Sequence, residues 1–322
     1  MEVRWGLAEL PGLLAGLSVE RPLLVASRRW RPEQLPVEVV DIWSEVPSDR
    51  IPAAAEAAAG SDGLLALGGG SAIDLTKAIS AETGLPMVSI PTTYAGAEWT
   101  RYFGVRDRDR LMRGSGAGAD LAGVVYEPEL TLGLPRAETV GTALNALAHS
   151  AEALYVEGRN EQADREAVAG AKLIAASLPR VVDNERDLEA RTRLLEGAMH
   201  AGTALASAGL GLGHAMAQAL GGRYGLPHGA LNAISLPAAL RFNEPVAAAE
   251  IAQLGEAMGT DDAIGRVEEL ARLGGFERLR DLGVPEDELA EVAAATASRG
   301  GAKANPRPAD AAQIEILLRS IW

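Results

Sequence analysis

The sequence has 322 residues, of which 48% are hydrophobic and 23% are charged, and its formal net charge is −14. These proportions are typical of a globular protein, and the length favours two domains. The negative charge argues against nucleic acid as a partner, because no basic face would neutralise phosphates. Cysteine is absent, which excludes disulfides, thiolate nucleophiles and thiolate metal sites and leaves four histidines and the carboxylates for chemistry.

No targeting or membrane segment is evident. Met1–Trp5 lacks a basic region followed by an apolar one, and no run of about 18 apolar residues suggests a membrane span. We therefore expect a cytoplasmic protein.

Strands and helices alternate over the first part of the chain. Apolar runs bounded by turn residues predict buried strands, and an alanine-rich segment predicts a helix. The predicted elements are strands at Pro22–Ser27 and Val37–Trp43, a helix at Ile51–Ala59, a strand at Leu64–Leu67, a helix from Ala72 and a strand at Met87–Ile90. This alternation favours a parallel sheet, whose ligand crevice lies at the carboxyl ends of its strands.

Three glycines, Gly68 to Gly70, and then Ser71 connect the strand at Leu64–Leu67 to the next helix. Glycines let a backbone approach a polyanion, and free N–H groups at a helix start favour a pyrophosphate. A tight turn without a ligand explains the triplet about as well when it is considered alone. The position at the end of a strand, beside the Pro91–Gly96 loop, favours the ligand, although the pattern is not GxGxxG.

The sequence changes character near Leu134–Arg136. Before it, Glu98–Ala122 is irregular and predicts a hairpin or loop, Val124–Tyr126 predicts a strand, and Glu127–Pro135 predicts a connector. After it, helical periodicity dominates. The predicted helices are Glu138–Glu157, Gln162–Ser177, Arg186–Ala206, Leu212–Leu220, Ala247–Met258, Thr260–Leu273 and Pro285–Ala297. We therefore predict an α/β domain at 1–135 and an all-helical domain at 136–322.

The histidines are candidates for chemistry in the helical part. His149 lies on a predicted helix with Asn145 four residues earlier on the same face, His214 and His228 follow later, and His200 stands apart. Each one alone is more often a satisfied core or surface residue than a ligand. Three imidazoles that converge from separate helices would suit zinc or iron. The sequence does not show whether they converge.

Four segments together resemble the iron-containing (group III) alcohol dehydrogenase family in order and spacing. They are Gly68–Lys77, Pro91–Glu98, Asn145–His149 and Pro227–Gly229. The resemblance implies an N-terminal parallel-sheet nucleotide-binding domain and a C-terminal helical catalytic domain, a dehydroquinate synthase-like arrangement with a cleft between the domains. It also implies an oxidoreductase that uses NADH or NADPH and forms a homodimer.

Within this family the chain is most similar to the maleylacetate reductases. The similarity rests on the Thr93–Gly96 loop, the Leu132–Pro135 connector, Asn145 and the segment Asn305–Pro308. It implies the reduction of a small anionic substrate, with maleylacetate converted to 3-oxoadipate. The alternatives are a metal-dependent alcohol or aldehyde dehydrogenase of the same family and a catalytically silent nucleotide-binding homologue.

The resemblance assigns roles residue by residue. Cofactor contacts are implied for Gly69, Gly70, Ser71, Asp74, Thr92 and Thr93. Catalytic roles are expected for His149, His214 and His228, and substrate contacts for Asn145, Thr100 and Arg101. A guanidinium binds carboxylates bidentately, which is why an arginine is included. Lys77 is expected to face the exterior of its helix or a partner.

Asn145 bears on the metal. Metal-using relatives are expected to carry an aspartate ligand at this position, and an amide oxygen is a weaker ligand than a carboxylate. The comparison favours a metal-free site, whereas in the alternative zinc or iron would bind at His149, His214 and His228. Gln218 stands where many relatives have a further histidine, and it cannot titrate.

The residues after the first predicted strand bear on the choice of cofactor. Relatives that prefer NAD often end an early strand in aspartate, whose charge repels a 2′-phosphate, whereas here Ser27 is followed by Arg28 and Arg29. Guanidinium groups at this place favour binding of NADPH as well as NADH. The alternative, that both arginines point into solvent, is equally compatible with the sequence.

Overall fold

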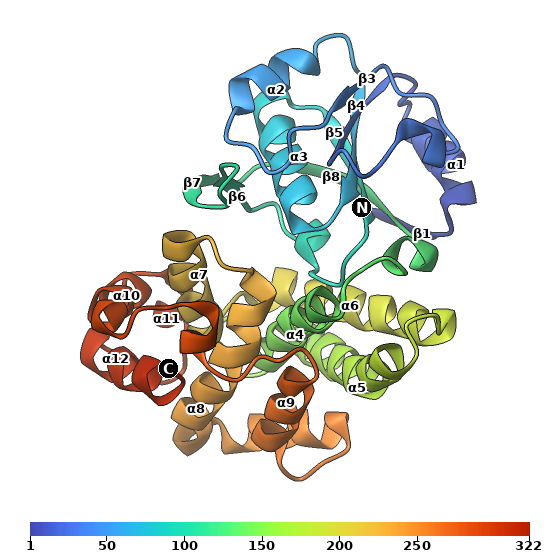
Figure 1. Cartoon of the computed structure of the whole chain (residues 1–322). Helices are drawn as coiled ribbons and strands as arrows, with labels where there is room; N and C mark the ends of the chain where they lie inside the picture. The colour runs from blue at the N-terminus through green and yellow to red at the C-terminus, as the bar shows by residue number, and fades with distance from the viewer. The chain divides into compact units, whose positions relative to one another are not determined.

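The computed structural model describes all residues from 1 to 322, and the chain divides into two compact units. The first unit comprises Met1–Thr93 and Ala97–Gly133, and the second comprises Tyr94–Gly96 and Leu134–Trp322. Figure 1 shows strands only in the first unit and helices throughout the second. The predicted fold class, a parallel-sheet α/β part followed by an all-helical part, is confirmed.

A six-stranded parallel sheet forms the centre of the first unit, in the order β1-β8-β5-β4-β2-β3. Its strands are β1 (Glu2–Trp5), β2 (Pro22–Ala26), β3 (Asp41–Trp43), β4 (Gly63–Gly68), β5 (Pro86–Pro91) and β8 (Asp120–Tyr126). The predicted strand at Val37–Trp43 is shorter than expected, and β1 was not predicted. Leu23–Val25 and Leu64–Leu67 are at most 1% exposed, because helices cover both faces of the sheet.

Three helices cover this sheet, α1 (Leu10–Gly16), α2 (Ile51–Ala57) and α3 (Gly70–Thr83). Leu10, Leu13 and Leu14 of α1 pack on one face, and α2 and α3 pack on the other face. Strand alternation explains this division, because Leu24 faces α1 while Leu23 and Val25 face α2 and α3. The predicted excursion contains a separate antiparallel hairpin of β6 (Phe103–Arg106) and β7 (Met112–Gly116).

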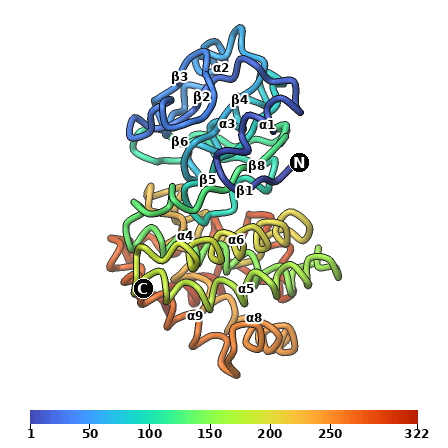
Figure 2. Tube along the Cα trace, turned by 90° about the vertical axis from the view of Figure 1, so that its right-hand side faces the viewer, coloured from blue at the N-terminus to red at the C-terminus, as the bar shows by residue number.

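The second unit is built from helices only. They are α4 (Arg136–Ala153), α5 (Glu161–Asp183), α6 (Leu188–Ala208), α7 (Leu212–Tyr224), α8 (His228–Met258), α9 (Ala263–Arg272), α10 (Leu289–Ala297), α11 (Gly300–Lys303) and α12 (Ala311–Ser320). Figures 1 and 2 both show α5 and α6 side by side. A second core joins α7 and α8 to α10 and α12.

The helix α8 begins much earlier than the predicted helix at Ala247–Met258. It contains Pro237 and Pro245, and the backbone departs from helical geometry at Ala247, with φ −134° and ψ 31°. Prolines normally end a helix, and residues 230–240 are buried without an amphipathic period, so no periodic pattern predicts a helix there.

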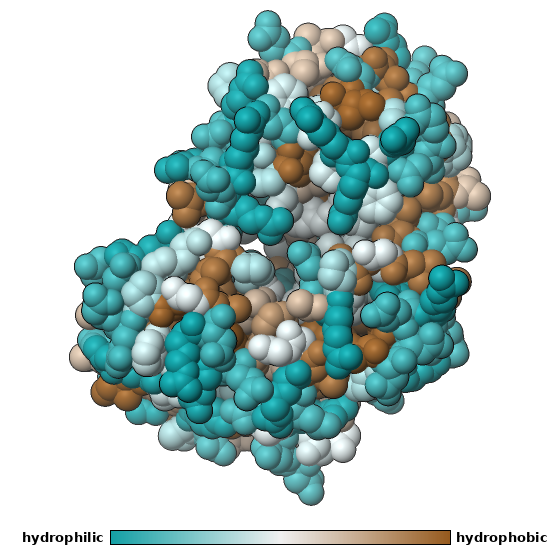
Figure 3. All heavy atoms as spheres, in the orientation of Figure 1, coloured by the Kyte–Doolittle hydropathy of each residue, from teal (hydrophilic) through white to brown (hydrophobic).

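The surface is ordinary for a globular chain. On the face drawn in Figure 3, hydrophilic residues predominate on each unit and hydrophobic ones form only small groups. No helix is both long and apolar enough to span a bilayer.

Candidate active site

The glycine turn of the first unit leaves helix amides uncapped. Gly68 ends β4 with φ +154°, Gly69 is the N-cap of α3, and no side chain caps the helix start at Gly70. The N–H groups of a helix's first turn have no partner within the helix, and the macrodipole places partial positive charge there. Gly70 and Ser71 therefore present a backbone surface suited to a diphosphate.

The loop after β5 rests on this turn. The Thr92 N–H donates to the Gly68 carbonyl oxygen at 3.0 Å. A Cβ on Gly69 would lie 2.8 Å from Thr93 Cγ2, so only glycine lets this side chain approach so closely. The structure thus brings five predicted cofactor residues to one edge of the sheet: Gly69, Gly70, Ser71, Thr92 and Thr93.

Asp74 and Lys77 hold the hairpin to α3. The Lys77 side chain is only 1% exposed, and its Nζ lies 3.1 Å from Asp74 Oδ1 and donates to the Tyr102 carbonyl at 2.9 Å. The expectation that Lys77 faces the helix exterior is therefore wrong. Asp74 Oδ2 accepts from the Gly104 N–H at 3.2 Å. Both Asp74 oxygens are thus engaged within the protein.

Arg29 reaches across the sheet edge. It follows β2, yet its Nη2 donates to Thr92 Oγ1, after β5, at 3.4 Å. Because β4 lies between β2 and β5, this guanidinium spans the end of β4, where the glycine turn begins. Arg28 is exposed. Of the two arginines, Arg29 therefore points toward the predicted phosphate-binding turn.

The predicted substrate residues Thr100 and Arg101 lie in the first unit. Arg101 is exposed and its Nη2 lies 3.9 Å from Asp120 Oδ1, a pair whose side chains are 64% and 56% exposed. Thr100 Oγ1 lies 3.5 Å from the Tyr102 carbonyl oxygen. Both residues belong to the first unit, whereas the histidines belong to the second.

Three histidines converge in the second unit. His149 lies on α4, His214 on α7, and His228 is the first residue of α8. The His149 and His214 rings stack with centroids 4.7 Å apart, and the His214 and His228 centroids are 5.8 Å apart. The fourth, His200, pairs elsewhere with Glu166, with 2.6 Å between Nδ1 and Oε2. The three rings that converge are those singled out from the sequence, which does not show their contact.

Two asparagine amides fix the orientation of neighbouring rings. Asn145 Nδ2 donates to the Ala95 carbonyl at 2.8 Å, which turns its Oδ1 toward Asn232. Asn232 Nδ2 donates to that Oδ1 at 2.6 Å and faces His228 Nε2 at 3.0 Å. A carbonyl only accepts, so the amide orientations follow one from another. His228 therefore accepts at Nε2 and carries its proton on Nδ1.

His149 has a longer contact of the same kind, because its Nε2 lies 3.4 Å from Asn145 Nδ2. This contact also favours a proton on Nδ1 of His149. The Asn145 amide is thus fully engaged with Ala95 and Asn232, and its side chain is only 5% exposed. Its placement supports a role in orienting the imidazoles. Asn232, fully buried on α8, was not identified from the sequence, because nothing local marks its contact with α4.

Glu152 is a second residue that sequence reasoning missed. It is fully buried, and its Oε2 lies 2.7 Å from His214 Nδ1. Asn145, His149 and Glu152 follow one another at spacings of four and three, which places them on one face of α4. That spacing could have identified Glu152 from the sequence, because Asn145 and His149 on the same face had already been singled out.

Burial lowers the pKa of His149 well below its ordinary value of 6.5, and the charges of His214 and His228 lower this pKa further. A desolvated imidazole favours its neutral form. His149 is therefore a neutral ring at neutral pH. Its Nδ1, the Nε2 of His214 and the Oδ1 of Asn232 are buried without a hydrogen-bond partner in the protein. Buried polar atoms of this kind call for a polar ligand or water.

The arrangement of donors does not fit a metal ion. Amide hydrogens of Asn145 and Asn232 face the Nε2 lone pairs of His149 and His228, and the Asn145 oxygen already accepts from Asn232. No group of three or more histidine, aspartate or glutamate side chains is placed to hold a metal. Asn145, which lies beside the three histidines, is also uncharged, whereas a carboxylate at this position would favour a divalent ion.

The segment Tyr94–Gly96 anchors the loop to the second unit. The Arg191 Nη1 donates to the Tyr94 hydroxyl at 3.0 Å, and the Tyr94 N–H donates to Thr142 Oγ1 at 3.3 Å. Gly96 has φ +71°, and a Cβ there would lie 3.4 Å from His149 Nδ1. The residues directly after Thr93 thus shape the surroundings of His149.

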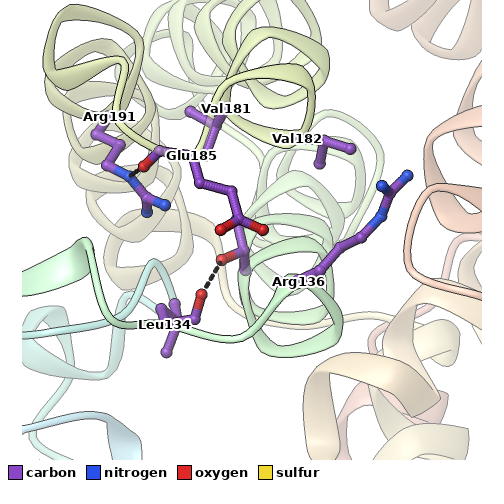
Figure 4. Close-up of a pocket in the computed structure, with 7 residues that line it drawn as sticks. Leu134, Arg136, Val181, Val182, Glu185 and Arg191 are labelled. Carbon is purple, nitrogen blue, oxygen red and sulfur yellow. Dashed lines mark hydrogen bonds between the residues drawn. The ribbon is translucent and has the colours of Figure 1, made fainter.

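A small pocket lies beside this anchor. Figure 4 shows Glu185 between Arg191 and Arg136, which point in different directions. Arg191 Nε donates to the Glu185 carbonyl at 2.8 Å. The pocket is lined by Leu134, Arg136, Thr139, Val181, Val182, Glu185 and Arg191. No predicted site residue lines it, so the histidine cluster is the candidate active site of the second unit.

Comparison with known proteins agrees with these observations. Residues 6–117 match the family model described as iron-containing alcohol dehydrogenase, and residues 139–322 match the C-terminal model of the same family. A maleylacetate reductase from Burkholderia cepacia is 40% identical over 264 residues, which cover 82% of this chain and 74% of that protein. Maleylacetate reductase 1 from Cupriavidus pinatubonensis is 35% identical over 96% of this chain and 90% of its own length.

A solved structure gives the same picture. The crystal structure of a maleylacetate reductase from Agrobacterium tumefaciens superposes with a TM-score of 0.88 at 31% identity, covering 100% of this chain and 95% of that one. The match extends through both units.

Proposed function

Because the chain belongs to the iron-containing alcohol dehydrogenase family, we propose that it is a metal-independent reductase of a small anionic substrate, with maleylacetate as the leading candidate. Its relatives make the chain an NAD(P)H-dependent oxidoreductase. The observation that carries the proposal is the cluster of His149, His214 and His228, in which asparagine amides face two of the ring nitrogens.

The first unit would hold the cofactor. Its diphosphate would bind to the backbone amides of Gly70 and Ser71, with Thr92 and Thr93 on the nicotinamide side. The nicotinamide supplies the hydride when it is bound. The task of the protein is to orient the substrate and to place hydrogen-bond donors where negative charge develops.

The second unit would supply those donors. In the reduction of maleylacetate, hydride adds to one carbon of the double bond, and the other carbon takes a proton to give 3-oxoadipate. Imidazole suits this chemistry because it exchanges a proton near neutral pH and donates through N–H. His149 and His228 carry their ring proton on Nδ1, because their Nε2 atoms face amide hydrogens. We assign to the three histidines the orientation of the substrate and the supply of the proton.

The same contacts support the proposal of metal independence. A divalent ion would have to displace the amide hydrogens from two ring nitrogens and would gain only the neutral oxygen of Asn145 in return. A metal-dependent alcohol or aldehyde dehydrogenase is the alternative within the family. The family resemblance also leads us to expect that this protein forms a homodimer and is located in the cytoplasm.

The test is a cofactor-oxidation assay on protein purified with and without a chelator. We expect maleylacetate to cause loss of the near-ultraviolet absorbance of NADH or NADPH, equally in both preparations. A stoichiometric metal that is lost together with activity would establish the metal-dependent alternative. Cofactor binding without turnover of maleylacetate or any short keto acid would indicate a catalytically silent homologue.

A further inference from the structure

The Glu152 carboxylate lies in a site built for it. Its Oε2 accepts from the Gly211 N–H at 2.7 Å, and its Oε1 accepts from the His214 N–H at 3.1 Å. Both donors belong to the start of α7, where the helix dipole favours a negative charge. The third donor is the His214 ring, with 2.7 Å between Nδ1 and Oε2. All of these groups are buried, so the contacts are made in a medium of low dielectric constant.

Two glycines make room for this carboxylate. A Cβ on Gly211 would lie 3.0 Å from Glu152 Cδ, and a Cβ on Gly213 would lie 3.0 Å from Oε1. The segment Gly211–His214 therefore wraps closely around the carboxylate, and a larger residue at either position would displace it by a few tenths of an ångström. Glu152 has no lysine or arginine partner among its hydrogen bonds. Its side chain is thus committed to the start of α7 and to His214.

This contact determines where His214 carries its proton. A carboxylate only accepts, so the ring must present N–H at Nδ1, and Nε2 then carries the lone pair. His149 and His228 have amide hydrogens facing Nε2, whereas Nε2 of His214 has no partner in the protein. The cluster therefore has one buried Nε2 lone pair that accepts no hydrogen bond from a protein group.

We propose that Glu152 is a positioning residue that locks His214 in the Nδ1–H tautomer and so keeps its Nε2 open as the hydrogen-bond acceptor of the cluster. This inference rests on the proposed function, in which the cluster receives the substrate. The acceptor holds a hydrogen of a water molecule beside the substrate. Through this water, the hydrogen bond holds the substrate in a fixed orientation relative to the hydrogen-bond donors of the protein during the reaction.

The discriminating variant is Glu152→Gln. With the glutamine oxygen at the Oε1 position it accepts from the His214 N–H, while the NH₂ group at the Oε2 position faces Nδ1 and drives the proton to Nε2, at the cost of the contact with the Gly211 N–H. The open acceptor then becomes a donor. The corresponding amide substitution in a Ser-His-Asp triad lowers kcat by about 10⁴ through the wrong tautomer. For Glu152→Gln we expect a loss in kcat of about 10³ or more, with the KM for NADH changed by less than about twofold.

The chain offers a matched control in Glu166, whose Oε2 lies 2.6 Å from His200 Nδ1 outside the cluster. Glu166→Gln makes the same chemical change at a second glutamate–histidine pair, and we expect it to leave kcat unchanged. Nitrogen-15 NMR of the histidine rings reports the tautomer directly. We expect the His214 signals to show Nδ1–H in the wild-type protein and Nε2–H in Glu152→Gln.

The spectroscopic and kinetic results separate two failures. Wild-type protein that reduces no acceptor would refute the proposed function, while the tautomer of His214 would still test the role of Glu152. A wild-type His214 with its proton on Nε2, or Glu152→Gln with unaltered kcat in an active enzyme, would overturn the inference. If Glu152→Gln does not fold, the wild-type spectrum decides alone.

Discussion

The imidazole rings of His149 and His214 stack with their centroids 4.7 Å apart and their planes 18° from parallel. Two protonated rings at this distance would repel each other in a buried site. The pKa of His149 is accordingly lowered, chiefly by burial and then by the charges of His214 and His228. The cluster is thus built to keep His149 neutral while its neighbours make hydrogen bonds of their own.

This neutrality predicts how stability depends on pH. In the unfolded chain His149 takes up a proton near its ordinary pKa of 6.5, whereas in the folded protein it does so only at lower pH. Between these two values the unfolded state binds more protons, so the free energy of unfolding falls as the pH drops below about 6.5. Urea denaturation at pH 7.5 and pH 5.5 measures the effect.

The variant His149→Gln should reduce this loss of stability between the two pH values, because glutamine does not titrate. The control is His200→Gln, since His200 is 30% exposed and lies outside the cluster. We expect the control to keep the wild-type dependence. An unchanged pH dependence in His149→Gln would show that burial of this ring does not govern acid sensitivity.

A second prediction concerns Asn145→Asp. The carboxylate would face the Ala95 carbonyl oxygen, which now accepts from the Asn145 amide at 2.8 Å, so a hydrogen bond becomes a repulsion. We expect a loss in stability of about 1 to 3 kcal/mol, the usual cost of leaving a buried polar group unsatisfied. The same change gives the three imidazoles a charged neighbour, which favours a divalent ion. Added zinc should therefore raise the melting temperature of the variant more than that of the wild type.

The control for this change is Asn243→Asp. Asn243 is fully buried and pairs with Asn305 through two amide hydrogen bonds of 2.9 and 2.7 Å. It should lose stability in the same way but gain no response to zinc. Equal zinc responses in the two variants would show that the carboxylate beside the histidines has no special effect.

The sequence was most informative where local pattern and function coincide. An apolar run followed by glycines and a helical period has few structural solutions, so the β4 turn and α3 were predicted. The length of α8 was not predicted, because it contains Pro237 and Pro245 and because residues 230–240 are buried without an amphipathic period. Local pattern also misplaced Lys77, whose partners Asp74 and the Tyr102 carbonyl depend on the hairpin.

The candidate site shows the same limit. Individual histidines were found through their segments, but their mutual contact arises from the packing of α4, α7 and α8. Asn232 acts on Asn145 across 87 residues of sequence, and Glu152 acts on His214 across 62. Such long-range hydrogen bonds leave no periodic trace, so a single sequence reveals the rings but not the groups that orient them.

A third prediction tests the glycine turn. In Gly69→Ala the new Cβ would lie 2.8 Å from Thr93 Cγ2, which forces the loop after β5 away from the turn. We expect the KM for NADH to rise about tenfold or more, equivalent to ~1.4 kcal/mol of lost binding. Gly12→Ala is the control, because its Cβ would meet nothing within 4 Å in α1. Similar cofactor binding in both variants would contradict the role of the turn.

The last prediction concerns Arg29, whose Nη2 lies 3.4 Å from Thr92 Oγ1 and whose guanidinium therefore spans the end of β4. A guanidinium beside a phosphate-binding turn favours an additional phosphate, and NADPH differs from NADH by its 2′-phosphate. We expect Arg29→Ala to raise the KM for NADPH by about tenfold, the loss of one charge-assisted hydrogen bond of ~1.4 kcal/mol, and to change the KM for NADH much less. Arg28→Ala is the control, and it should have the smaller effect on NADPH because the hydrogen bond to Thr92 is made by Arg29. Equal increases for both cofactors in Arg29→Ala would instead place the guanidinium on the diphosphate that the two cofactors share.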